Sequence, residues 1–273
     1  MNEKMRKVLM VLFGMVFICS FGMFLYQTIE SKKGADIYLE AERLAYSDDI
    51  PGKTGSEDTE ENDGSGETEI WQEETVENDY YIPILERTNL AALRNVNTDV
   101  LGWIGIPGTK LSYPFVQGED NDYYLNRTWN RESSIVGSVF MEHLNRSDFS
   151  DYHTIIYAHH MMDGTMFGSL RDYKDPKHLE KNPYIYIYDD RGAHRYEIFS
   201  IYEAYVESNT YRIGFKDDED KREFLDECIK QSIYKIDVVP SINEIILKLS
   251  TCTNTGGYST RWVVQARLKA MKN

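Results

Sequence analysis

The hydrophobic pattern divides the chain into one long apolar run, one polar stretch and a series of short apolar segments. Residues 8–26 contain no charged side chain. As a helix they would measure roughly 28 Å, close to the hydrocarbon core of a bilayer at about 30 Å. We therefore expect a membrane-spanning anchor, and a cytoplasmic tail at residues 1–7 that carries three basic side chains. A cleaved signal peptide is the alternative, and either interpretation places the remainder outside the cytoplasm.

The polar stretch covers residues 27–80. Residues 35–45 place Ile37, Ala41 and Leu44 on one side of a predicted short helix, but Asp, Glu, Gly, Ser and Thr dominate from residue 47 to about 78. Residues 36–79 hold 16 of the 45 acidic residues and two of the 30 basic ones, so the net charge of −15 belongs mainly to this stretch. We predict an acidic, largely disordered linker over 27–80 and a folded domain over 81–273.

The folded domain alternates short apolar strands with few helices. Apolar positions at helical spacing predict helices at 85–96 and 215–232, with shorter helical pieces at 120–125 and 166–173. Apolar and β-branched segments predict strands at 101–108, 112–116, 135–141, 153–158, 184–188, 195–206, 245–251 and 261–268. A mainly β protein with helical additions, built as a closed barrel, fits this pattern.

Composition narrows the chemistry. Outside the acidic stretch the charges nearly balance, so we expect no nucleic-acid partner. Three cysteines are too few for a disulfide framework, and their spacing does not match a zinc site. We predict no metal and no other cofactor.

Cys252 is the candidate nucleophile. It ends a predicted strand, and Arg261 begins the next strand after a turn that contains a Gly-Gly pair. Paired strands would bring the thiol and the guanidinium to one rim, where a cation favours the thiolate. Cys19 lies within the predicted anchor, and Cys228 lies on the apolar side of the helix at 215–232.

A thiol nucleophile also needs a proton acceptor. His159 and His160 both follow a predicted strand, and successive residues of a strand point to opposite faces. One of the two can therefore face Cys252, and the residue types alone do not choose between them. His143 also ends a strand, whereas the other three histidines are predicted to lie at the surface.

Several motifs together resemble the sortases, which are membrane-anchored cysteine transpeptidases. Leu249-Ser-Thr-Cys252, with Arg261 nine positions later, is similar to the sortase signature. Residues 157–170, which read Tyr-Ala-His-His-Met-Met-Asp-Gly-Thr-Met-Phe-Gly-Ser-Leu, resemble the class B members, as do 100–108, 113–118 and 122–125. The resemblance covers roughly residues 83–270. It implies an eight-stranded sortase-type barrel with N-terminal helices and a long helix between strands 6 and 7.

The resemblance also implies roles for individual residues. Cys252, His159 and Arg261 would be catalytic, and Ser250 and Thr251 would line the approach of the substrate. The chain departs from the family pattern at Ala158, where Gly is usual, and at His160, where Asn is common. His160 therefore stays as the alternative histidine.

By the same resemblance, the protein would cleave a C-terminal sorting signal of secreted proteins after Thr, through a thioester on Cys252. The acyl group would pass to an amine of a peptidoglycan precursor or a pilin, with the domain on the cell-wall side of the membrane. Two alternatives stay open. A cell-wall cysteine peptidase or amidase would also use Cys and His, although usually with the Cys first in the chain. A catalytically silent anchored binding domain would have an unreactive Cys252.

Overall fold

The computed structural model describes residues 3–46, 79–252 and 259–272. The helices of this part are α1 (Glu3–Ala45), α2 (Ile82–Leu85), α3 (Leu90–Val96), α4 (Pro176–Lys181) and α5 (Asp218–Gln231). Its 3-10 helices are η2 (Tyr123–Asn126), η3 (Gly168–Lys174) and η4 (Asn209–Tyr211). Its strands are β1 (Val100–Gly105), β2 (Ser112–Val116), β3 (Val139–Met141), β4 (His153–Ala158), β5 (Tyr184–Asp189), β6 (Gly192–Tyr205), β7 (Ile246–Cys252) and β8 (Thr260–Lys272).

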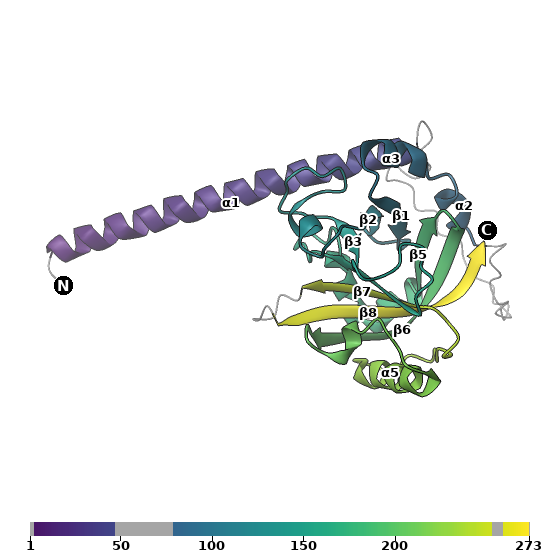
Figure 1. The fold of residues 1–273 in the computed structure, drawn as a ribbon. Helices are drawn as coiled ribbons and strands as arrows, with labels where there is room; N and C mark the ends of the chain where they lie inside the picture. The colour runs from purple at the N-terminus through teal and green to yellow at the C-terminus, as the bar shows by residue number, and fades with distance from the viewer. Residues whose placement is uncertain (1–2, 47–78, 253–258, 273) are drawn as a thin grey trace, which may run out of the picture.

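The eight strands form one closed barrel in the order β1-β2-β3-β4-β7-β8-β6-β5 (Figure 1). The β2–β3 and β4–β7 pairs are parallel, and the other pairs are antiparallel. The predicted eight-stranded barrel is confirmed, and α5 lies between β6 and β7 as expected. The parallel β4–β7 pair brings the C-terminal ends of two distant segments to the same edge of the barrel.

Strand β7 separates two hydrophobic clusters. Leu247 and Leu249 belong to the main barrel core, whereas Ile246 packs with Phe224 and Cys228 of α5. This division follows from the alternation of side chains along a strand. Helix α5 therefore covers the outer side of the sheet with its apolar positions and leaves its charged positions in solvent.

Helix α1 runs without interruption for 43 residues, whereas the sequence predicted an anchor and a separate short helix. By length and composition it could cross a membrane, and its most apolar window is not buried against the protein. Its C-terminal part packs on the barrel, where the Tyr38 hydroxyl donates to the Gly137 carbonyl at 2.6 Å. The Trp129 Nε1–H donates to the Ile37 carbonyl at 3.2 Å. Residues 47–78 of the predicted linker lie outside the described residues, and the domain boundaries stay a prediction.

Several predicted elements differ in their bounds or type, and three examples follow. The helix expected at 85–96 is divided into α2 and α3, because the Asn89 side chain accepts a hydrogen bond from the Ala92 N–H and caps a new helix. The strand expected at 135–141 is shortened to β3, since Gly137 turns the chain with a φ of 64°. The helical piece expected at 166–173 is the 3-10 helix η3.

Candidate active site

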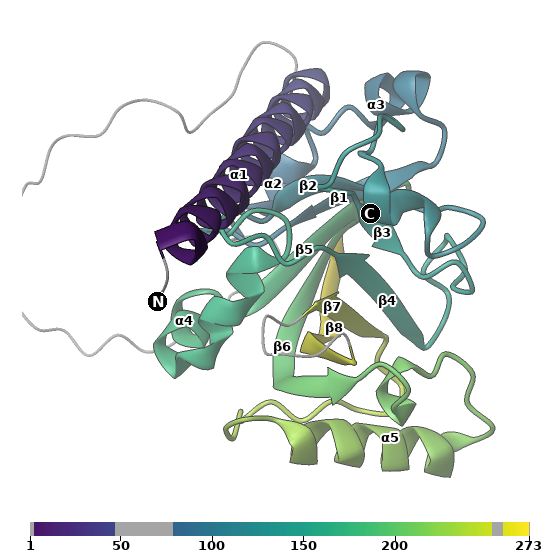
Figure 2. The same cartoon turned by 90° about the vertical axis from the view of Figure 1, so that its left-hand side faces the viewer.

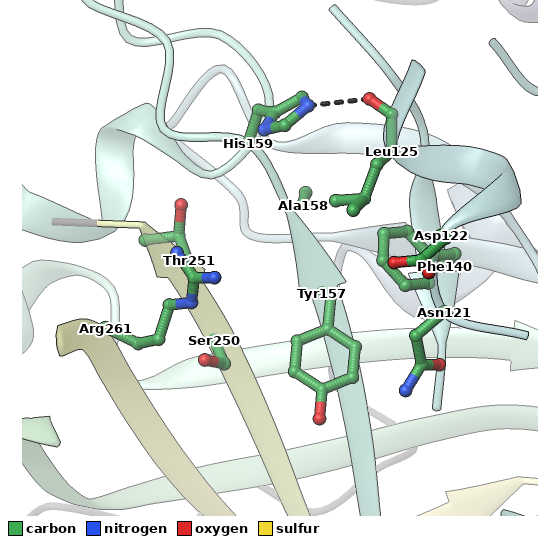
Figure 3. Close-up of a pocket in the computed structure, with 10 residues that line it drawn as sticks. All are labelled: Asn121, Asp122, Leu125, Phe140, Tyr157, Ala158, His159, Ser250, Thr251 and Arg261. Atoms are coloured by element: carbon green, nitrogen blue, oxygen red, sulfur yellow. Dashed lines mark hydrogen bonds between the residues drawn. The ribbon is translucent and has the colours of Figure 1, made fainter. Parts of the chain in front are cut away.

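A pocket of about 190 Å³ opens where β4 and β7 end (Figure 3). Among the described residues, its lining includes four of the predicted site residues: His159, Ser250, Thr251 and Arg261. The other lining residues are Asn121, Asp122, Leu125, Phe140, Tyr157 and Ala158. Segments that are far apart in the sequence thus meet in one depression.

The strand register explains why these segments meet. Cys252 pairs with Arg261 in the antiparallel β7–β8 ladder. Ala158 pairs with Thr251 in the parallel β4–β7 ladder, so His159 and Cys252 are the residues that follow this pair on the two strands. The backbone of Cys252 therefore lies between the strand that carries Arg261 and the strand that leads to His159. The side chain of Cys252 lies outside the described part.

The imidazole of His159 is held from one side. Its Nε2 lies 2.6 Å from the Leu125 carbonyl oxygen. Because a carbonyl oxygen only accepts hydrogen bonds, Nε2 carries the proton, and Nδ1 is the nitrogen left for proton exchange. Gly137 leaves room for the imidazole in this position. A Cβ built on Gly137 would lie 2.9 Å from the His159 Cδ2 atom, which is too close.

His160 is directed elsewhere. It forms an isolated backbone bridge with Met166 and does not appear among the described lining residues of the pocket. Burial is the main cause that lowers the pKa of His160, and Arg171 and Lys174 lower it further. The geometry therefore brings His159, and not His160, to the pocket.

Arg261 lies at the start of β8, opposite Ala204 of β6 as well as Cys252 of β7. Tyr157 lies between two charges: burial and Glu142 raise the pKa of its hydroxyl, and Arg261 opposes this shift. Arg261 therefore places a guanidinium in the pocket lining, next to the strand end at Cys252.

Ser250 and Thr251 line the pocket but are almost inaccessible. The Ser250 hydroxyl lies 3.0 Å from the Tyr211 hydroxyl. The Thr251 Oγ1 atom is buried and has no hydrogen-bond partner in the described structure.

Sequence reasoning missed Asn121, Leu125 and Tyr157 as pocket residues. Leu125 and Tyr157 belong to segments that resemble class B members, and Asn121 lies in a predicted turn, but no role was assigned to any of them. Asn121 and Leu125 carry no nucleophile or proton-transfer group, and Tyr157 is one of 20 tyrosines, so residue type alone gave no signal. Cys228 is fully buried, and burial raises the pKa of its thiol, as expected of a structural cysteine. In the described part of the chain, no group of three or more His, Cys, Asp or Glu side chains is placed to hold a metal ion.

Comparison with known proteins agrees with this geometry. A family model for the sortase domain matches residues 104–269. Sortase B of Staphylococcus aureus is 35% identical over 178 residues, which are 65% of this chain and 73% of that protein.

Two solved structures of sortase B also match. The Staphylococcus aureus sortase B–substrate complex has a TM-score of 0.62 at 36% identity, covering 65% of this chain and 83% of the other. A sortase B complexed with triglycine has a TM-score of 0.61 at 35% identity, covering 66% and 84%. The protein therefore belongs to the sortase family, in class B, and is a cysteine transpeptidase.

Proposed function

We propose that Cys252, His159 and Arg261 are the catalytic residues, and that the protein cleaves a C-terminal sorting signal after Thr. The observation that carries this proposal is the convergence of His159 and Arg261 on one pocket, at the strand end where Cys252 pairs with Arg261. The Cys252 thiolate attacks the carbonyl carbon of the Thr-Xaa bond and forms a tetrahedral intermediate. When this collapses, the C–N bond breaks and the substrate threonine remains as a thioester on Cys252.

His159 moves the proton in both steps. Its Nε2–H is bound to the Leu125 carbonyl, so a proton on Nδ1 passes to the departing amine. The neutral Nδ1 then takes a proton from the incoming amine, which attacks the thioester and releases the thiolate.

Arg261 supplies the positive charge for the oxyanion that develops in each tetrahedral intermediate. A cation placed where charge appears stabilises the transition state more than the ground state. Ser250 and Thr251 contribute the inner wall against which the substrate residue lies. Both are held by the β4–β7 ladder, which makes this wall rigid.

Relatives support the two substrate classes. A sortase B has been solved in a substrate complex, and another structure of sortase B contains triglycine. We infer that this chain takes secreted proteins with a sorting signal as acyl donors, and an amine of a peptidoglycan precursor or a pilin as acceptor. The apolar part of α1 would anchor it in the cell membrane, with its N-terminus in the cytoplasm and the barrel on the cell-wall side.

The test uses the full chain in detergent, a library of peptides that contain a Thr-Xaa bond, and triglycine as the amine. The expected product is a peptide joined to triglycine through its threonine. Cys252→Ala should abolish cleavage and ligation, and cleavage that persists in this variant would refute the assignment. His159→Ala should reduce the rate at least a hundredfold, with His160→Ala as the matched control. Equal losses in the two variants would contradict the choice of His159.

The same assay separates the alternatives. A cysteine peptidase or amidase would give only the hydrolysed peptide, whatever the triglycine concentration. A silent binding domain would cleave nothing and would leave Cys252 unmodified by iodoacetamide. A transpeptidase gives a ligated product whose share rises with the amine.

A further inference from the structure

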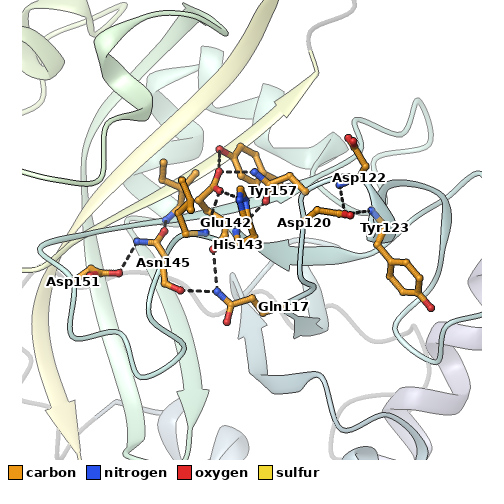
Figure 4. Close-up of polar contacts among 12 residues, drawn as sticks. Gln117, Asp120, Asp122, Tyr123, Glu142, His143, Asn145, Asp151 and Tyr157 are labelled. Carbon is orange, nitrogen blue, oxygen red and sulfur yellow. Dashed lines mark hydrogen bonds and ion pairs between the residues drawn. The ribbon is translucent and has the colours of Figure 1, made fainter.

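A buried carboxylate lies directly behind the pocket wall. Glu142 follows β3 and is only 7% exposed. Burial of a carboxylate is costly unless several donors satisfy it. Figure 4 shows Glu142 between Tyr157 and His143, within a network of polar contacts. The donors that satisfy this carboxylate therefore indicate what it does.

Two of these donors belong to the pocket lining. The Asn121 Nδ2 donates to the Glu142 Oε2 at 2.7 Å, and the Tyr157 hydroxyl donates to the same oxygen at 2.9 Å. Both residues line the pocket, where their side chains lie next to each other (Figure 3). The outer oxygen, Oε1, lies 2.7 Å from the His143 Nδ1 and accepts from the Leu144 N–H at 3.3 Å.

These contacts fix the orientation of both pocket residues. A carboxylate only accepts, so Tyr157 must point its hydroxyl proton at Glu142, and Asn121 must present its amide NH2 group. The Asn121 Oδ1 accepts from the His143 N–H at 3.0 Å, which confirms this orientation of the amide. Burial and the Glu142 charge raise the pKa of Tyr157, so its hydroxyl stays protonated and remains a donor.

Through these two hydrogen bonds, the Glu142 carboxylate connects two segments of the pocket that do not pair with each other in the barrel. Tyr157 lies on β4, and Asn121 lies in the turn before η2, the helix whose Leu125 carbonyl holds His159. We propose that Glu142 is a positioning residue, which sets the width of the substrate subsite between β4 and η2 through Tyr157 and Asn121. This inference rests on the proposed function, because it takes the pocket as the substrate site.

The loop that contains Glu142 has other supports. The Glu142 N–H donates to the Ile155 carbonyl, which extends the β3–β4 ladder without the side chain. Asp151 accepts from the Asn145 Nδ2 at 2.8 Å and from the Arg146 N–H at 2.7 Å. Asp151 is therefore a matched control: it is an acidic residue of the same network that does not contact the pocket residues.

The experiment measures kcat and KM of the full chain in detergent with a fluorogenic Thr-Xaa peptide, selected by screening a library on the unmodified protein. Glu142→Met keeps the volume but removes both acceptor oxygens, so we expect KM to rise about tenfold, with kcat changed less than threefold. Glu142→Gln keeps an acceptor toward Tyr157 and Asn121, and should restore KM to within threefold. Asp151→Asn should leave KM within twofold.

A second readout separates positioning from a general loss of structure. The rate at which iodoacetamide alkylates Cys252 should change less than twofold in Glu142→Met, since the proposal leaves His159 in place. Tyr157→Phe should raise KM by itself, and Glu142→Met should add less than twofold in that background. If Glu142→Met does not fold, Tyr157→Phe and Glu142→Gln still test the proposal.

The proposal is overturned if Glu142→Met leaves KM unchanged, if its effect adds fully to that of Tyr157→Phe, or if alkylation slows in parallel with KM. If Glu142→Met does not fold, an unchanged KM in Tyr157→Phe overturns the proposal. A failure of the proposed function gives a different result, because peptide cleavage would then survive Cys252→Ala. In that case both the catalytic assignment and the role of Glu142 would be refuted.

Discussion

At the scale of single residues, the orientation of His159 depends on a backbone carbonyl and a glycine, neither of which takes part in the proposed reaction. The Leu125 carbonyl holds its Nε2, and Gly137 lies against the edge of its ring. Gly137 has a φ of 64°, a conformation that residues with a side chain rarely adopt. A Cβ at this position would lie 2.5 Å from the Leu125 oxygen, which is closer than packed atoms allow. Because Gly137 has a hydrogen atom in place of a Cβ, the Leu125 carbonyl and the His159 imidazole have room to form their hydrogen bond.

Gly137→Ala should therefore impair catalysis more than folding. The added methyl group pushes the Leu125 carbonyl and His159 apart, so we expect kcat/KM to fall at least tenfold and the alkylation of Cys252 at neutral pH to slow. Gly164→Ala is the control, because Gly164 has a φ of 79° but only the Lys110 side chain nearby, at 3.9 Å. Equal activity of the two variants would show that the contact with His159 is unimportant.

At the scale of elements, α5 covers a second core that contains an unexpected charge. Lys248 of β7 is fully buried between the barrel and α5, and its Nζ donates to the Thr210 Oγ1 at 2.7 Å. The Nζ also lies 5.0 Å from the centre of the Tyr211 ring. Burial lowers the pKa of Lys248 to about 7, while Cys228 and Glu227 oppose the shift. The strand that leads to Cys252 is thus packed around a lysine that titrates near neutral pH.

The pH dependence of stability tests this assignment. Lys248 binds its proton less tightly in the folded than in the unfolded state. Below pH 7 both states hold the proton, and the full cost of burying the charge applies. Between pH 7 and about 10 the unfolded state holds more protons, so stability rises with pH by up to about 1.4 kcal/mol per unit.

Lys248→Met should remove this dependence. The Tm of the variant relative to the unmodified protein should be highest at pH 6–7 and should fall steadily toward pH 9.5, as measured by thermal unfolding in detergent. Lys230→Met, which replaces an exposed lysine of α5, is the control and should shift Tm equally at all pH values. A constant difference for Lys248→Met would contradict a titrating buried lysine.

At the scale of the whole molecule, the sequence predicted all eight strands and their closure into a barrel, but apart from the β7–β8 pair it did not predict their order. The predicted bounds of β2 and β4 agree with the structure, and the Gly-Gly turn predicted the β7–β8 pair. The Leu-Ser-Thr-Cys and Tyr-Ala-His motifs pointed to the barrel only through their resemblance to known proteins. The hydrogen bond between His159 and the Leu125 carbonyl could not be predicted, because it joins residues 34 positions apart through a backbone atom. The hydrogen bond from Tyr38 to the Gly137 carbonyl could not be predicted either, because it also joins distant residues through a backbone atom.

The continuity of α1 was also hidden, because charged residues interrupt its apolar pattern between the predicted anchor and Tyr38. This continuity has a consequence for the position of the pocket. The apolar run ends at residue 26, and Tyr38 binds the barrel 12 residues later, about 18 Å further along the helix. The arrowhead of β7 and the start of β8 lie on the side toward the N-terminal end of α1, and β8 ends on the opposite side (Figures 1 and 2). A stiff helix would therefore hold the pocket toward the proposed membrane at a fixed height.

Fluorescence quenching in nanodiscs tests this orientation. A chain with Cys19 and Cys252 replaced by alanine takes a fluorophore at Ser259→Cys or at Met271→Cys, near the two ends of β8, which spans roughly 40 Å. Lipids with a nitroxide headgroup should quench the label at position 259 several times more strongly than the label at position 271, because the rigid helix keeps the start of β8 nearer the bilayer. Ten Gly and Ser residues inserted after Thr28 should abolish the difference, since a flexible joint lets the barrel rotate. Equal quenching without the insertion would mean that α1 does not orient the barrel.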